Sequence, residues 1–174
     1  MSYLVLIRMR VNVYAFVYFN GALMDNQHPH ILEDPHNIRT ILQESQTIAV
    51  LGIKPESRAG QPAHDVPKYM KKAGYTIIPV PTYYPEVTSI LGEPVVRDMT
   101  ALTQRIDILN VFRKPEDLPA HFDDIVALNP RVVWLQQGIQ HDEMAHKLAA
   151  RGIKVVQDHC IMVAHRNFNV LKAV

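Results

Sequence analysis

The sequence predicts one α/β domain built on an open parallel sheet of about five or six strands, with helices on both faces. Short apolar runs rich in β-branched residues alternate with helical segments along residues 25–174. Helices and short loops join successive runs, as parallel strands require. The chain has 174 residues, of which 48% are hydrophobic and 20% charged. These values are typical of one globular domain with a sizeable core.

The first predicted helix begins at Asp34-Pro35. An aspartate can cap the free amides of a helix, and proline suits the first helical position. Apolar residues then fall on one face at helical spacing: Ile38, Ile41 and Leu42. The pattern predicts an amphipathic helix at the start of the domain.

Five apolar runs predict buried strands, at residues 47–51, 75–80, 106–111, 132–135 and 153–156. Pro79 suggests the end of the second strand. Predicted helices lie between the strands, at residues 62–73, 98–102 and 141–151, and a further one lies within residues 115–128 and begins near Pro119. Gly74 and Gly152 suit the left-handed caps that end two of these helices. Residues 81–94, rich in proline, have the character of a loop. Asp107 alternates with apolar neighbours, so we expect it to be a structural acid held by hydrogen bonds.

Residues 1–24 are apolar and aromatic, with Arg8 and Arg10 as their only charges. The run after Arg10 is interrupted by asparagines and is shorter than the roughly 20 apolar residues that span a bilayer. One interpretation is a signal peptide that ends at the small residues Gly21-Ala22. The other is an extension from an upstream start, outside the domain. We expect the domain to occupy residues 25–174.

Charge and cysteine content exclude several classes of function. The formal net charge of +1 offers no broad cationic face, so nucleic acid is a poor partner. The single cysteine, Cys160, excludes an internal disulfide framework and a multi-thiolate zinc site. The histidines are scattered and form no HExxH motif, so no metal site is expected. These features favour a reducing compartment, the cytoplasm.

In open parallel sheets the ligand lies beyond the carboxyl ends of the strands. Five segments follow the predicted strands: residues 52–60, 80–84, 112–113, 136–139 and 158–160. We expect these segments to converge in space, although they are distant in sequence. They are therefore the candidate binding site.

The first of these segments suits a phosphate. Gly52 has no Cβ, so backbone can approach a ligand there, and the following helix N-terminus favours anions. Lys54, Ser57 and Arg58 add two cations and a hydroxyl. The alternative is a plain solvated turn with incidental basic residues. The glycine spacing fits neither GxGxxG nor GxxxxGK[ST].

The end of the second strand argues against a dinucleotide. NAD sites usually place a carboxylate there to hold the ribose hydroxyls, but this chain has none until Glu86. Val80 and Pro81, followed by Tyr83 and Tyr84, suit an adenine ring better. The alternative is that the tyrosines only cover the sheet edge.

Phe112 and Arg113 follow the third strand. A buried strand that ends in arginine needs a partner for the charge. That partner is either a ligand phosphate or a nearby acid, Glu116 or Asp117. After the fourth strand, Gln136, Gly138 and Ile139 form a second edge able to recognise anions or amides.

Catalytic machinery is harder to find. Cys160 follows the last strand beside His159 and is either a small buried residue or a thiol nucleophile. No Ser/His/Asp arrangement or carboxylate pair follows from the spacing. The sequence thus predicts a binding site without a catalytic set.

The run TIAVLGIKPESRAGQPAHDVPKYMKKAGYTIIPVP at residues 47–81 resembles the opening of the small CoA-binding proteins. Their domain is similar to the N-terminal CoA-binding domain of the succinyl-CoA synthetase α-subunit. Further matches occur at residues 108–116, 132–140 and 155–164, so the resemblance covers about residues 31–168. It implies a Rossmann-like fold and a coenzyme A ligand.

The resemblance also implies roles for individual residues. Those implied to meet the CoA phosphates are Gly52, Ile53, Lys54, Ser57 and Arg58. Those implied to border the adenine are Val80 and Pro81, and the rest of the ligand would meet Phe112, Arg113, Gln136, Gly138 and Ile139. The chain departs from the family at Val80-Pro81-Thr82, where Val-Asn-Pro is common. The synthetase's phosphorylated histidine lies in a further domain that has no counterpart here, so ligase activity is not implied.

We therefore expect a stand-alone protein that binds CoA or acyl-CoA without turnover of its own, with no nucleic-acid or membrane partner. The sequence leaves its oligomeric state open. One alternative is an NAD(P)-linked oxidoreductase on the same fold. Another is a redox role in which Cys160 forms a mixed disulfide with CoA.

Overall fold

The computed structural model of the chain describes residues 17–19, 22–24 and 28–170. Its centre is a parallel five-stranded sheet in the order β4-β3-β7-β8-β9. The strands are β3 (Thr47–Leu51), β4 (Thr76–Val80), β7 (Ile108–Val111), β8 (Val132–Leu135) and β9 (Lys154–Val156). The predicted open α/β sheet of Rossmann-like type is confirmed.

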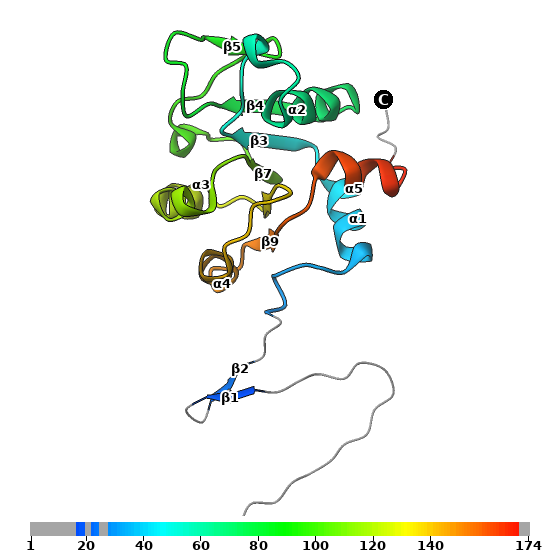
Figure 1. Ribbon diagram of the computed structural model, residues 1–174, viewed down its shortest axis with the longest axis vertical. Coiled ribbons are helices and arrows are strands. Elements are labelled where there is room, and N and C mark those ends of the chain that lie inside the picture. The colour runs from blue at the N-terminus through cyan, green and yellow to red at the C-terminus, as the bar shows by residue number, and fades with distance from the viewer. Residues whose placement is uncertain (1–16, 20–21, 25–27, 171–174) are drawn as a thin grey trace, which may run out of the picture.

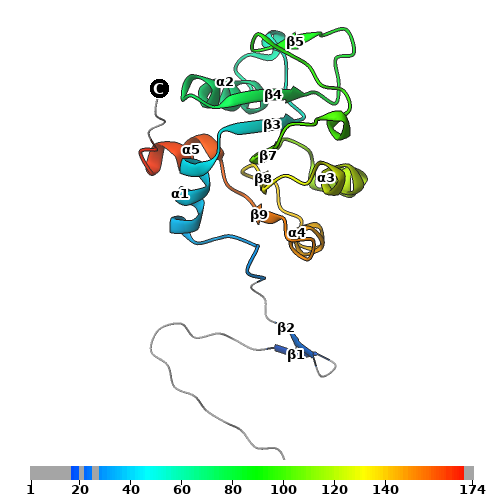
Figure 2. The ribbon, with the colours of Figure 1, turned by 180° about the vertical axis from the view of Figure 1, so that it is seen from behind.

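Helices cover both faces of this sheet, as predicted. Figures 1 and 2 show α3 and α4 along one face, and α1, α2 and α5 along the other. The α-helices are α1 (Pro35–Glu44), α2 (Pro62–Lys72), α3 (Phe122–Leu128), α4 (Asp142–Ala149) and α5 (Ile161–Asn167). Three 3₁₀-helices are η1 (Glu56–Arg58), η2 (Met99–Ala101) and η3 (Pro115–His121).

The core forms two layers because side chains along a strand point alternately to the two faces of the sheet. Ile48 and Val50 of β3 pack in the layer under α1, α2 and α5. Ala49 and Leu51 pack in the layer under α3 and α4. Trp134 is fully buried in the first layer, and its Nε1 donates to the His159 carbonyl oxygen at 2.6 Å.

Helix α1 begins as its sequence predicts. The Asp34 side chain accepts a hydrogen bond from the Asn37 amide at 3.0 Å, and Pro35 is the first helical residue. Ile38, Ile41 and Leu42 are buried, so the apolar stripe of this helix packs on the core.

Asp107 joins the amino ends of two neighbouring strands. Its Oδ2 accepts hydrogen bonds from the amides of Gln46 and Thr47, at 2.8 and 3.0 Å, and from Thr47 Oγ1 at 3.1 Å. Thr47 Oγ1 also accepts from the Asp107 amide. Burial pushes the pKa of Asp107 up, but these hydrogen bonds together hold it below its ordinary value. The expectation of a structural acid is confirmed.

Several elements differ from the sequence predictions. The predicted loop at residues 81–94 contains a short antiparallel pair, β5 (Ser89–Ile90) and β6 (Glu93–Pro94). The helix predicted within residues 115–128, with its start near Pro119, is α3, and it begins at Phe122 after the 3₁₀-helix η3. Helix α5 was not predicted. Pro79 lies within β4 rather than at its end, and the strand tolerates it because β4 is at the edge of the sheet.

Before the domain, β1 (Val17–Phe19) and β2 (Ala22–Met24) pair antiparallel. The other residues of the predicted extension lie outside the described residues, so its two interpretations stay predictions. Within the part of the chain that is described, no helix has both the length and the apolar character needed to cross a membrane.

Candidate functional site

The strand order places a topological switch point at the carboxyl end of β3. From β3 the chain passes to β4, which pairs with one side of β3, and the next strand of the same sheet, β7, pairs with the other side of β3. The Gly52 amide donates to the Val80 carbonyl at 2.8 Å, and the Phe112 amide donates to the Leu51 carbonyl at 2.9 Å. The ends of β3, β4 and β7 are therefore held together where such sheets bind ligands.

Gly52 is required by the backbone at this point. Its φ is +85°, and a Cβ added to it would lie 2.5 Å from the Phe112 carbonyl oxygen. The space that a side chain would need is thus filled by the chain itself. We predicted that a ligand would approach Gly52 closely, but the backbone that follows β7 occupies this position instead.

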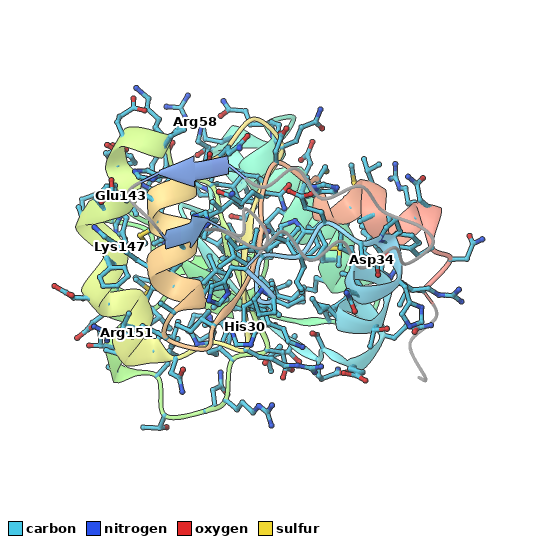
Figure 3. All side chains as sticks on the ribbon, turned by 90° about the horizontal axis from the view of Figure 1, so that it is seen from below. His30, Asp34, Arg58, Glu143, Lys147 and Arg151 are labelled. Atoms are coloured by element: carbon cyan, nitrogen blue, oxygen red, sulfur yellow. The ribbon has the colours of Figure 1, made fainter. Side chains whose placement is uncertain are left out.

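The two basic residues of the loop after Gly52 differ in their exposure and in their contacts. The Ile53 side chain is buried in the core, so its backbone is what remains for a ligand. Lys54 Nζ donates to Gln61 Oε1 at 2.6 Å. Ser57 and Arg58 are exposed in η1, and the Arg58 guanidinium lies 5.9 Å from the centre of the Tyr84 ring. Figure 3 places Arg58 toward the end of the molecule where α4 begins, far from Arg151.

A first cavity, cavity A, opens beside the end of β4 and has a volume of about 840 Å³. It is lined by residues 80–85 and 97–99, together with Leu51, His121 and Asp124. Val80 and Pro81, which were predicted to contact the adenine, therefore line this cavity. Tyr83 is 64% exposed there.

Arg113 lies beside cavity A and already contacts three side chains of the protein. Its guanidinium donates to Thr82 Oγ1 at 3.0 Å and to Asp117 at 2.6 Å, and it lies 5.4 Å from the centre of the Tyr83 ring. The side chain is half-buried, with 13% of its surface exposed, and its Nε has no hydrogen-bond partner among the described residues. The sequence predicted either a ligand phosphate or a nearby acid as the partner of Arg113, and the structure shows the acid, Asp117.

Arg97 is a site residue that the sequence analysis missed. Its guanidinium donates to the carbonyl oxygens of Tyr83, Tyr84 and Val87, at 3.3, 2.8 and 2.6 Å. It thereby shapes the tyrosine loop and lines cavity A. No periodic pattern marks an arginine in a loop, and its role depends on carbonyl groups ten or more residues earlier in the chain.

His121 also lines cavity A and was missed. Burial and the positive charge of Arg113 hold its pKa below the ordinary value, against the opposing effect of Asp124 and Asp117. This lowered pKa favours the uncharged form of the ring. A negatively charged group placed beside it would raise this pKa.

A second cavity, cavity B, opens at the same edge over the other face of the sheet, and its volume is about 660 Å³. It is lined by Gly60, Pro62, Asp65, Val66, Phe112, residues 136–139, Cys160, Met162 and Val163. The predicted site residues Phe112, Gln136, Gly138 and Ile139 thus share one hollow. Helix α5, absent from the sequence prediction, supplies Met162 and Val163.

The glycine turn beside cavity B is already tied to the chain. The Gly138 amide donates to Asp158 Oδ1 at 2.6 Å, and the Asp158 amide donates to the Ile139 carbonyl at 3.1 Å. The amide that was expected to meet an anion therefore has a carboxylate partner. This leaves Gln136 as the better candidate for polar recognition in the cavity.

Gln136 is hydrogen-bonded to a buried asparagine of β7. Its Nε2 donates to Asn110 Oδ1 at 2.6 Å, and both residues are buried. Asn110 Nδ2 has no hydrogen-bond partner among the described residues. Nε2 has one further N–H, and Oε1 is the atom of Gln136 that can accept a hydrogen bond from a ligand amide.

Cys160 is a free, half-buried thiol that lines cavity B. His159 Nδ1 lies 2.7 Å from the Gln157 carbonyl oxygen, so this nitrogen is occupied by backbone. Within the described residues, no three metal-ligating side chains gather in one place.

These observations define an open parallel α/β domain of Rossmann-like type with two ligand-sized hollows at the carboxyl edge of its sheet. Residues 46–166 match the CoA binding domain family. The chain belongs to this family. The prediction drawn from the resemblance is confirmed at this level.

The chain is also similar to proteins from other organisms. The chain is 39% identical over 128 residues to the protein YneT of Bacillus subtilis strain 168, across 74% of this chain and 91% of that one. It is similar to a solved Thermus thermophilus protein, cell-free ID.343, with 38% identity, a TM-score of 0.71 and coverage of 78% and 99% of the two chains. A Pyrococcus horikoshii OT3 protein matches at 25% identity, with a TM-score of 0.70 and coverage of 79% and 93%.

Proposed function

We propose that this protein binds coenzyme A or an acyl-CoA as a stand-alone cytoplasmic protein, without turnover of its own. The adenosine lies in cavity A, the phosphates lie near the basic groups beside it, and the pantetheine passes the switch point to cavity B. Membership of the CoA binding domain family supports the ligand. The single cysteine supports a reducing compartment.

The observation that carries this proposal is the difference between the two cavities. Cavity A combines two tyrosines and two prolines with the nearby cations Arg97, Arg113 and Arg58, and Asp98 and Asp124 also line it. Such a surface suits a purine and its phosphates. Cavity B is mainly apolar and has Gln136 and Gln137 in its lining, which suits a pantetheine arm with amide groups. Both volumes lie within the range of ligand pockets, about 300–1,000 Å³.

A dinucleotide fits this site less well. The end of β4 reads Val80-Pro81-Thr82, and the Thr82 hydroxyl already accepts from Arg113. The ribose of NAD would find no carboxylate at this position. The test therefore compares the two ligands directly.

Isothermal titration of the full chain provides this test. We expect CoA to bind with one site per chain and more tightly than NAD. Arg58→Ala should weaken CoA binding by about 1–3 kcal/mol, or roughly 5- to 150-fold, as for a charge-assisted contact. Arg39→Ala, at an exposed position on α1, is the matched control and should bind as the natural chain does.

Two results would refute the proposal. One is the absence of heat at millimolar CoA, and the other is tighter binding of NAD than of CoA. Equal losses in Arg58→Ala and Arg39→Ala would instead remove Arg58 from the phosphate site.

A further inference from the structure

We propose that cavity B takes the acyl chain of a neutral, monocarboxylic acyl-CoA and discriminates against acyl groups that end in a carboxylate. This inference rests on the proposed function, because it assumes that CoA occupies the switch point. It adds the chemical class of the group carried by the CoA sulfur.

The walls of cavity B are suited to hydrocarbon. Apolar side chains come from three elements: Val66 from α2, Phe112 from the end of β7, and Met162 and Val163 from α5. Met162 is half-buried, and an unbranched thioether adapts to chains of different length. Burial of an acyl chain against these groups removes apolar surface from water.

The exposure of Val163 supports a contact with ligand. Among the described residues, two large apolar side chains are conspicuously exposed: Tyr83 at 64% and Val163 at 45%. Tyr83 lines cavity A, and Val163 lines cavity B. Each hollow therefore has one uncovered apolar side chain at its edge.

The charges around cavity B argue against an acidic acyl group. Asp65 is the one charged side chain among the described residues that line it, and its Oδ1 accepts from the Gly60 amide at 3.2 Å. None of the basic groups of the site lines cavity B: Lys54 donates to Gln61, Arg58 lies over Tyr84, and Arg113 donates to Thr82 and Asp117. A carboxylate in cavity B would lose water, gain no cation and face Asp65.

Butyryl-CoA and succinyl-CoA form a matched pair for the test, because both acyl groups contain four carbons and differ in their far end. Isothermal titration of the full chain should give tighter binding of butyryl-CoA, by on the order of tenfold or more. Butyryl-CoA should also bind about fifteenfold more tightly than acetyl-CoA, at about fourfold for each buried methylene.

A charge placed in the cavity should change this preference. Met162→Lys brings a cation beside the acyl chain and should reduce the ratio of butyryl-CoA to succinyl-CoA affinity by at least tenfold. Ala150→Lys adds the same charge at an exposed position after α4, outside the cavity, and should leave the ratio unchanged. If Met162→Lys does not fold, the two thioesters on the natural chain still decide the question.

The possible failures are distinguishable. If CoA itself does not bind, the proposed function falls. If CoA binds but butyryl-CoA and succinyl-CoA bind equally, or succinyl-CoA binds more tightly, the proposed function stands and this inference is wrong.

Discussion

Several residues of this site already contact other groups of the protein in the absence of a ligand. Gly52 lacks a Cβ because the Phe112 carbonyl occupies that space, and Arg113 is already paired with Asp117. The Gly138 amide is bonded to Asp158. A glycine or an arginine after a strand can therefore either bind a phosphate or contact a neighbouring segment of the protein. The sequence pattern alone does not distinguish these two roles.

Gly52→Ala gives a prediction at this scale. The substitution imposes a positive φ on alanine and a clash with Phe112, so we expect a loss of unfolding free energy of about 1–3 kcal/mol or more. Urea denaturation of both proteins measures it. Gly152→Ala is the control, since its φ is +81° but a Cβ there meets nothing within 4 Å. Equal losses in the two variants would contradict the clash.

At the scale of elements, hydrogen bonds between neighbouring strands matter as much as burial. Asp107 ties the start of β7 to residues before and within β3. At the carboxyl ends, the Phe112 amide after β7 donates to the Leu51 carbonyl of β3, and the Gly52 amide after β3 donates to the Val80 carbonyl of β4. Both ends of the central strand pair are therefore fixed, which sets the geometry of the switch point.

Asp107→Asn gives a pH-dependent prediction. The folded pKa of Asp107 is below its ordinary value. The carboxylate therefore adds stability above the unfolded pKa, near 4, and this contribution disappears as the pH falls through the folded pKa. We expect the variant to lose about 1–3 kcal/mol of unfolding free energy at pH 7 and less at pH 3.

Urea denaturation at both pH values measures this difference. Asp107→Ala, which also removes the acceptor oxygen, is the matched comparison and should lose stability at both. A loss in Asp107→Asn that is the same at pH 7 and pH 3 would show that its charge does not contribute.

At the scale of the whole molecule, the sheet separates two hollows of different chemistry. Cavity A lies over the face covered by α3 and cavity B over the face covered by α2 and α5. A ligand with a charged aromatic end and an apolar end can therefore bind across the carboxyl edge. Binding would tie together both core layers.

Ligand binding should consequently stabilise the whole domain. CoA at one hundred times its Kd stabilises the folded state by about 2.7 kcal/mol, which corresponds to roughly 5–10 °C in Tm for a chain of this size. Thermal unfolding with and without CoA measures the shift, with NAD at the same concentration as the comparison. A shift with NAD that equals the shift with CoA would contradict selective binding of CoA.

Local patterns determined most of the elements. The continuous apolar run at residues 47–51 and the cap at Asp34 act within a few residues, so both were predictable and are confirmed. Helix α5 was missed because it has seven residues and its apolar positions gave no long periodic pattern. The start of α3 was expected near Pro119 but lies at Phe122, because Pro119 fits a 3₁₀-helix as well as the start of an α-helix.

The sequence by itself determined the α/β class, the run of parallel strands and the family resemblance, because apolar periodicity and turn residues are local properties. Only the tertiary structure decided which groups line each hollow and which are already satisfied. Arg97, His121 and Met162 joined the site through contacts with segments distant in the chain. Such contacts depend on how strands and helices pack, and one sequence carries no local signal for them.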